Sequence, residues 1–246
     1  CSLPVSVNGQ REGVRRIDGI SNGRCAIRKR ESGETKSMGE VIMPIADVNG
    51  IGIHYRFDGP EGGEVVLFSN SLASDMTMWE SQIAPLSGAG YRLLRYDGRG
   101  HGKSSVPAGP YTMETLASDA VALMDRLGIS RAHFCGLSLG GMVGQMLGAL
   151  HGKRLLSLTL CDTSPYIAQR GIWDERIAWV RKAGMASVVD ATINRWFTHR
   201  GQERLREAVE RARNAILSTP VEGYCGCGRA IDAMDLREMI RGISVR

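Results

Sequence analysis

A serine between glycines, in the segment Gly136-Leu137-Ser138-Leu139-Gly140, constrains the fold of this chain more than any other feature. The apolar residues Phe134 and Cys135 run into it, and a helix-like stretch of small and apolar residues leaves it. A serine on a sharp strand-to-helix turn takes strained backbone angles, and its neighbours must be small. The helix N-terminus then presents backbone N–H groups to a developing oxyanion. The pattern predicts that Ser138 is a nucleophile; the alternative is a glycine-rich helix start packed on a sheet.

Strand-like and helix-like segments alternate from residue 45 to residue 160. The apolar runs expected as strands cover 51–57, 65–68, 91–96, 133–135 and 155–161. The clearest helix covers 113–127, with Thr112 as its N-terminal cap and Gly128 at its end. Short continuous apolar runs are typical of strands that are buried on both faces. The alternation therefore predicts an α/β fold, with a mostly parallel sheet flanked by helices.

The pattern changes after Thr163. No further strand-like run follows, and the helices expected there cover 173–182, 186–197 and 204–217. The last of them carries an apolar stripe formed by Leu205, Val209, Ala212 and Ile216. We therefore divide the chain into a core, residues 43–162, and a helical cap, residues 163–242.

Positive charge is concentrated near the start of the chain. Residues 1–42 hold eight Lys/Arg and five Asp/Glu, and the whole chain has a net charge of +5. These residues show no strand or helix period, so we expect a disordered or non-native extension, with Met43 as the true start; a transit peptide is a weaker alternative. The basic stretch 28–30 is too short to indicate nucleic-acid binding. No apolar run is long enough to span a membrane or to form the core of a secretory signal.

The cysteines do not form a disulfide scaffold, since there are only six in 246 residues. Cys135 and Cys161 lie in apolar runs and are expected as buried thiols. Cys225 and Cys227 have no second pair or histidine cluster beside them that would complete a zinc site. We therefore expect a cytoplasmic protein with no metal.

Several segments together resemble the α/β-hydrolase superfamily and, within it, the 3-oxoadipate enol-lactonases of aromatic catabolism. These segments are 69–79, 95–112, 133–145, 195–197 and 219–238. Asn70-Ser71 and Val221-Glu222-Gly223-Tyr224 carry the likeness to the lactonases in particular. The resemblance implies an α/β-hydrolase fold with a helical cap, a serine nucleophile, no cofactor, and hydrolysis of an enol-lactone to 3-oxoadipate.

The fold also implies where an oxyanion hole would form. The backbone N–H of Leu139, next to the serine, and that of Leu72, in the loop after the strand at 65–68, are the candidates. Asp97 and Arg99 are expected to pin the loop that follows the strand at 91–96. We do not assign His101 as the general base, because in this fold the histidine follows the nucleophile and the acid along the chain.

The family pattern has two more strands after the cap, which bring the triad aspartate and histidine. This chain ends at Arg246, where the first of them is expected, and roughly 50–60 residues would be needed to complete the pattern. We therefore expect a core without its last two strands, an unpaired apolar sheet edge, and no triad acid or histidine. Asp162 is a weak stand-in for the acid, and a simple strand-end turn is the commoner explanation for it. Without a base the serine is a poor nucleophile, so we expect negligible lactonase activity.

Substrate-binding residues are less strongly indicated. An enol-lactone of this kind carries a carboxylate, so a cation is expected near the pocket. Arg195 beside Trp196 is the candidate, with Trp79 as an apolar wall, although these side chains could equally serve packing. The expected partner is a small anionic lactone or ester, with no nucleic acid and no membrane, and the oligomeric state is left open. The alternatives are a general esterase or C–C bond hydrolase of the same fold, and a non-catalytic fragment or frameshifted product.

Overall fold

The structure is a computed structural model that describes residues 44–168 and 171–245. The expected extension at residues 1–42 lies outside the described residues. The strands are β1 (Ile45–Val48), β2 (Ile51–Asp58), β3 (Val65–Ser69), β4 (Arg92–Tyr96), β5 (Ala132–Leu137) and β6 (Leu155–Cys161). Every strand that the sequence predicts is therefore present, in nearly the expected positions.

The strands form one six-stranded sheet in the order β1-β2-β4-β3-β5-β6. β2 pairs antiparallel with both β1 and β4, whereas β4, β3, β5 and β6 run parallel to one another. The predicted mostly parallel sheet is thus confirmed. β6 lies at an edge, and no strand of the described residues pairs with its outer side.

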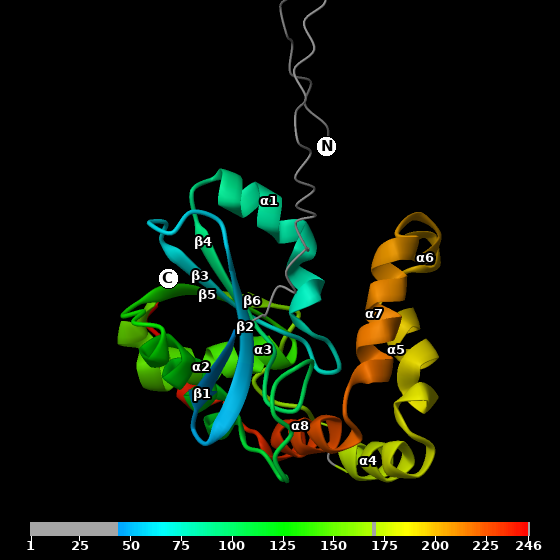
Figure 1. Ribbon diagram of the computed structural model, residues 1–246. Helices are drawn as coiled ribbons and strands as arrows, with labels where there is room; N and C mark the ends of the chain where they lie inside the picture. Colours follow the sequence, from blue (N-terminus) through cyan, green and yellow to red (C-terminus); the bar gives the residue numbers. More distant parts are fainter. Residues whose placement is uncertain (1–43, 169–170, 246) are drawn as a thin grey trace, which may run out of the picture. The chain divides into compact units, whose positions relative to one another are not determined.

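Helices cover both faces of the sheet (Figure 1). α2 (Met113–Arg126) and α3 (Leu139–His151) pack with the larger apolar core on one face. The short helix η1 (Met76–Trp79) and α1 (Glu80–Gly88) cover a smaller cluster around Phe68 and Leu93 on the other. The α2 caps are as predicted, since the Thr112 hydroxyl accepts from the N–H of Thr115 at 3.1 Å and Gly128 has φ +70°.

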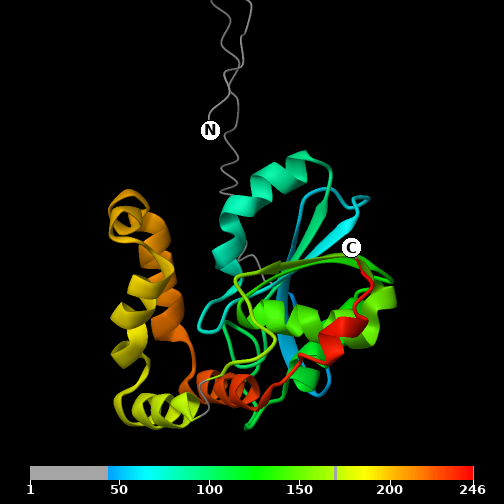
Figure 2. The same ribbon diagram turned by 180° about the vertical axis from the view of Figure 1, so that it is seen from behind.

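Only helices and turns follow β6 in the described residues, apart from one isolated bridge between Tyr166 and Asp235. They are α4 (Ile172–Ala183), η3 (Met185–Val188), α5 (Val189–Trp196), α6 (His199–Arg204), α7 (Arg206–Ser218), α8 (Val221–Ala233) and η4 (Met239–Gly242). Before β6, the short helix η2 (Gly152–Arg154) follows α3. α5 and α7 lie side by side (Figure 2). The predicted place of Leu205 on the apolar stripe is wrong, because Leu205 precedes α7 and is 54% exposed.

α8 and η4 return the helical segment to the core. A Cβ atom on Gly223 would collide with the backbone carbonyl of Gly100, and one on Gly226 would lie 2.7 Å from the ring of Tyr111. The glycines therefore let α8 approach the loop after β4 at backbone distance. η4 contacts α3.

The cysteines of the sheet are less buried than the sequence predicts. Cys135 and Cys161 are half-buried. For Cys161 the reason is its place at the end of the edge strand β6, whereas Cys135 lies on the interior strand β5. Cys225 and Cys227 are buried in α8. Within residues 44–168 and 171–245, no group of three His, Cys, Asp or Glu side chains is placed to hold a metal ion. No helix in the same ranges is both long and apolar enough to cross a bilayer.

Candidate active site

Ser138 occupies the turn between β5 and α3, with φ 53° and ψ −111°. A non-glycine residue with these angles is strained and must be held in place by its surroundings. Three hydrogen bonds hold it: its N–H donates to the carbonyl of Cys161 at 2.9 Å, and its carbonyl accepts from Met142 N at 2.9 Å and from Thr163 Oγ1 at 2.8 Å. The end of β6 therefore fixes the backbone of the candidate nucleophile.

The glycines around Ser138 allow this turn to be sharp. A Cβ atom on Gly136 would collide with the carbonyl of Gly140, and one on Gly140 would collide with the carbonyl of Ser69 at the end of β3. Gly141 leaves just enough room for Thr163, since a Cβ there would lie 2.7 Å from the threonine Cβ. The sequence argument that the neighbours of the serine must be small has its physical reason in these contacts.

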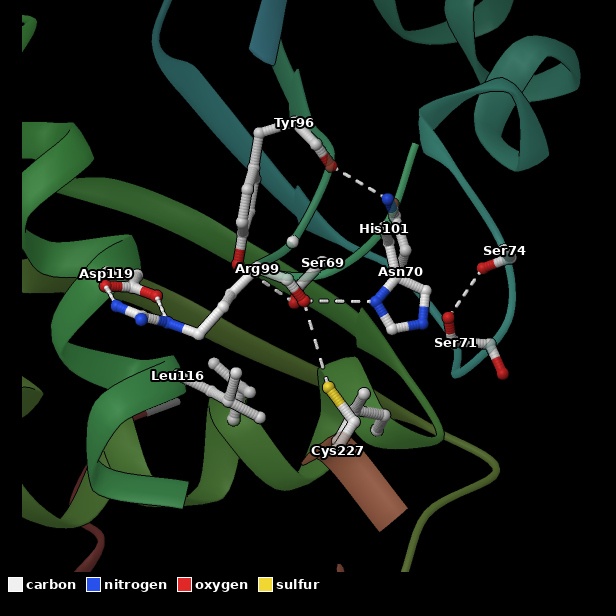
Figure 3. Close-up of a pocket in the computed structure, with 13 residues that line it drawn as sticks. Ser69, Asn70, Ser71, Ser74, Tyr96, Arg99, His101, Leu116, Asp119 and Cys227 are labelled. Carbon is white, nitrogen blue, oxygen red and sulfur yellow. Dashed lines mark hydrogen bonds and ion pairs between the residues drawn. The ribbon is translucent and has the colours of Figure 1, made fainter. Parts of the chain in front are cut away.

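The loop after β3 is anchored by His101. The N–H of Ala73, a residue with φ +60°, donates to His101 Nε2 at 3.0 Å. Because Nε2 accepts, the proton lies on Nδ1, which donates to the carbonyl of Arg99 at 3.1 Å. Burial lowers the pKa of His101, which keeps the ring neutral. Figure 3 shows His101 beside Asn70 and Ser71. Its hydrogen bond to Ala73 ties it to the loop that also carries Leu72.

Asn70 fixes the start of the same loop. Its amide Nδ2 donates to the carbonyl of Tyr96 at 2.8 Å, and its Oδ1 accepts from the indole N–H of Trp79 at 2.8 Å. Trp79 is buried, packs 4.7 Å from Phe68 between ring centroids, and does not line the large cavity described below. The structure therefore places Trp79 behind the loop and not at a substrate-facing wall, because its indole N–H needs the buried amide as a partner.

Asp97 and Arg99 pin the loop after β4, as the sequence indicates. The Asp97 carboxylate accepts from Met76 N at 2.8 Å, from Lys103 N at 3.0 Å and from His54 Nδ1 at 2.6 Å. Arg99 donates two hydrogen bonds to Asp119 of α2, at 2.7 and 2.8 Å. This pairing raises the pKa of Arg99. A small cavity of about 30 Å³ lies between these groups and the loop after β3 (Figure 3).

A second, much larger cavity, of about 720 Å³, is lined by Ser138 itself. Its volume is in the range of small-molecule sites. It brings together five of the residues that the sequence singles out: Leu72, Ser138, Asp162, Arg195 and Trp196. Leu139 lies behind the serine and its side chain lines the small cavity. As the first residue of α3, Leu139 has an N–H without a partner inside the helix, as an oxyanion hole requires.

No histidine of the described residues lines the large cavity that Ser138 faces. The chain has five histidines, all within the described residues: His54, His101, His133, His151 and His199. His54 bonds to Asp97, His101 to Ala73 and Arg99, and His133 to Ser157. The remaining two lie at the ends of helices, His151 in α3 and His199 in α6. No hydrogen bond joins any of them to the Ser138 hydroxyl in the part of the chain that the structure describes. Asp162, at φ +41°, follows β6 and faces the same cavity as Ser138.

Comparison with known proteins agrees with this architecture. A family model for the alpha/beta hydrolase fold matches residues 64–225. This chain belongs to the α/β-hydrolase family. Among curated relatives, 3-oxoadipate enol-lactonase 2 of Acinetobacter baylyi is 34% identical over 195 residues, which are 79% of this chain and 73% of the relative.

Solved structures give the same result for this α/β-hydrolase. The enol-lactonase from Burkholderia xenovorans LB400 has a TM-score of 0.80 and 44% identity, covering 82% of this chain and 78% of its own. A hydrolase from Pseudomonas aeruginosa PA01 has a TM-score of 0.77 and 38% identity, covering 80% of this chain and 75% of its own. The predicted α/β-hydrolase fold and the resemblance to enol-lactonases are therefore confirmed.

Sequence reasoning missed two features of the site. One is the coupling of His101 to the loop after β3, for which the only signal was the position of His101 after a strand. The other is a group of cavity residues on α4 and α8, Arg176 and Tyr224. Tyr224 was named only as part of the segment 221–224 that resembles the lactonases, and its place in the cavity wall was not predicted. Its large side chain in a helix rich in small residues was a further signal.

Proposed function

We propose that this α/β-hydrolase cleaves a carboxylic-ester bond through Ser138, and that its substrate is an enol-lactone of the 3-oxoadipate type. The observation that carries the proposal is the strained turn of Ser138, which faces a cavity of about 720 Å³. That cavity is lined by three arginines of the helical segment, Arg176, Arg195 and Arg211. The named activity of the Acinetobacter and Burkholderia relatives supports the choice of substrate.

The reaction would proceed through an acyl-enzyme. Ser138 Oγ attacks the lactone carbonyl while its proton leaves to a base, and the resulting oxyanion accepts hydrogen bonds from the N–H groups of Leu72 and Leu139. The ring C–O bond then breaks, and the released enol oxygen takes a proton and tautomerises to a ketone. Water hydrolyses the acyl-enzyme to a carboxylate and restores the serine hydroxyl.

Arg195 and Trp196 remain the candidates for contact with the substrate, since both line the cavity. A cation at this position would attract the carboxylate that such a lactone carries. Asp162 lines the same cavity and is a candidate for orienting a base. Metal-free chemistry is part of this proposal, because a serine, a base and two backbone N–H groups are sufficient for acyl transfer.

The base is the group that the 246-residue chain supplies least well. In the described residues no histidine forms a hydrogen bond with Ser138, which supports the proposal that its hydroxyl lacks an imidazole base. In serine hydrolases the oxyanion hole and binding alone still give roughly 10³–10⁴-fold acceleration over water. We therefore propose that this chain has negligible lactonase activity by enzyme standards, and that any Ser138-dependent rate adds to this residual acceleration.

The direct test compares the purified 246-residue chain with its Ser138→Ala variant on the enol-lactone and on a panel of neutral esters and C–C hydrolase substrates. We expect a slow rate on the lactone, which falls in the alanine variant to the part that the oxyanion hole and binding supply without a nucleophile. A faster rate on the neutral esters would favour a general esterase, and equal rates in both proteins would favour a non-catalytic chain. Ser138-dependent turnover of about 10 s⁻¹, an ordinary enzyme rate, would contradict the argument about the base.

A further inference from the structure

The wall of the large cavity that the helical segment forms contains a buried hydroxyl that forms no hydrogen bond of good geometry and, among the described residues, has only Arg176 close enough to interact with it. The hydroxyl is that of Tyr224 of α8, which lines the cavity and is 1% exposed. A buried donor that forms no hydrogen bond costs free energy, so such groups are rare and call for an explanation. In a ligand-binding cavity, the simplest explanation is a bond made to the ligand.

An arginine lies directly beside this tyrosine. The guanidinium carbon of Arg176, on α4, lies 5.8 Å from the ring centroid of Tyr224 and 5.1 Å from that of Trp173. The two aromatic rings are themselves 6.2 Å apart. Contact with two aromatic faces attracts the guanidinium and restricts its rotamers. Arg176 is therefore positioned by apolar neighbours before any ligand binds.

Arg176 also lacks the carboxylate partner that other arginines of this segment have. Arg181 pairs with Glu222 at 3.4 Å, Arg213 with Asp190 at 2.7 Å, and Arg229 with Asp174. No carboxylate of the described residues forms such a pair with Arg176, which is half-buried. A half-buried cation without a counterion favours an anion in the adjacent cavity.

The electrostatics of Tyr224 agree with this arrangement. Burial raises the pKa of its hydroxyl, and the charge of Arg176, a side-chain interaction of the hydroxyl with the Arg176 guanidinium, and the charge of Arg195 oppose that shift. As an acceptor from Arg176, the hydroxyl would still have its own proton to donate. The hydroxyl therefore stays protonated at neutral pH and is able to donate. The acidic residues of the cavity, Asp75, Glu80 and Asp162, come from the other wall, and Glu80 is already paired with Arg95 at 3.0 Å.

We propose that Arg176 and Tyr224 form a carboxylate-binding site in which the guanidinium pairs with the substrate carboxylate and the phenol hydroxyl donates a hydrogen bond to it. This site rests on the proposed function only in taking the cavity as the place where substrate binds. It assigns the specificity for an anionic substrate to residues of α4 and α8, whereas Arg195 of α5 is exposed to solvent and acts at longer range.

The test measures binding and not turnover. Isothermal titration calorimetry on the full 246-residue chain compares adipate, a linear dicarboxylate, with its neutral diamide. We expect Arg176→Gln to weaken adipate binding about tenfold or more and Tyr224→Phe about fivefold or more, with no change for the diamide. Arg181→Gln is the matched control, because Arg181 lies on the same helix and already has a carboxylate partner.

Tyr224→Phe has a second readout that a structural role would not give. Because the hydroxyl forms no hydrogen bond of good geometry, its removal should leave the melting temperature of the ligand-free protein unchanged or raise it, while adipate binding falls. A marked fall in melting temperature would overturn the assignment. So would adipate affinities within about twofold of wild type in both variants, or equal weakening by Arg181→Gln.

Failure of this site and failure of the proposed function are distinguishable. If Ser138→Ala has no effect on lactone hydrolysis but adipate binds as expected, the function is overturned and the site stands. If hydrolysis depends on Ser138 but adipate binding depends on Arg195 and not on Arg176 or Tyr224, the function stands and the site is overturned.

Discussion

His101 Nε2 accepts the backbone N–H of Ala73 at 3.0 Å, so a histidine on the loop after β4 sets the conformation of the loop after β3. Ala73 follows Leu72, whose N–H is the proposed second donor of the oxyanion hole. This hydrogen bond is sensitive to substitution of either residue, because Ala73 has φ +60° and both partners are buried. A residue that resembles a catalytic base in the sequence thus serves as a positioning residue.

Replacement of His101 by alanine should destabilise the protein by about 1–3 kcal/mol, since it leaves a buried N–H unsatisfied. His101→Asn, which keeps an acceptor oxygen, should recover part of this loss. Urea unfolding of the three proteins gives the comparison. Equal stability of the alanine variant and wild type would show that water or another group replaces the imidazole.

The same histidine should contribute to the pH dependence of stability. Burial lowers the pKa of His101 in the folded state below its ordinary value of 6.5, so the unfolded chain binds the proton first as the pH falls. The contribution is therefore fully present above about pH 6.5 and is lost as the pH falls from there towards the folded-state pKa. Unfolding free energies between about pH 7.5 and pH 5.5 should fall more in wild type than in His101→Asn. Parallel pH profiles would contradict this assignment.

The backbone strain at Ser138 predicts that the conformation needed for function lowers the stability of the fold. Ser138→Gly and Ser138→Ala both remove the hydroxyl, but only glycine accepts φ 53° and ψ −111° at little cost. We expect the glycine variant to be more stable than the alanine variant by about 1 kcal/mol, after allowing for the greater freedom of the unfolded glycine chain. Both should lack the hydrolysis that depends on the serine hydroxyl. A more stable alanine variant would mean that the turn relaxes when the side chain is lost.

Close packing at Gly140 predicts a large effect from one added methyl group. Gly140→Ala places a Cβ against the carbonyl of Ser69, so we expect a loss of about 2 kcal/mol or more, together with displacement of the turn. Gly88→Ala is the control, because nothing lies within 4 Å of a Cβ at that last residue of α1. Thermal unfolding should separate the two variants clearly, and equal melting temperatures would argue against the close contact.

If the proton acceptor limits the rate, a small base in solution should restore it. The cavity of about 720 Å³ has room for imidazole beside Ser138. Lactone hydrolysis should rise with imidazole concentration and with the neutral fraction of imidazole, through a pH of about 6.5–7. Ser138→Ala should show only the solution reaction of imidazole with the lactone. The same acceleration in both proteins would remove the serine from the mechanism.

The parts of the fold that sequence predicted well are those governed by local patterns. The strand at 65–68 and the helix at 113–127 were found because apolar periodicity and end caps depend on neighbouring residues. Trp79 was misplaced because its partner is the Asn70 side chain, and apolarity does not indicate which side of a loop a residue faces. Arg176 was not singled out, because an arginine that faces a cavity follows the same helical pattern as one that faces solvent.

The two hydrogen bonds that join Ser138 to the end of β6 have a consequence for motion. Cys161 and Thr163 hold the N–H and the carbonyl of the serine, and the first helix after Thr163, α4, begins at Ile172. Any hinge that lets the helices move away to admit a ligand must therefore lie after Thr163, since bending earlier would break both bonds. The backbone of Ser138 would then keep the same conformation while the helices open and close, so ligand entry would not change the geometry of the nucleophile.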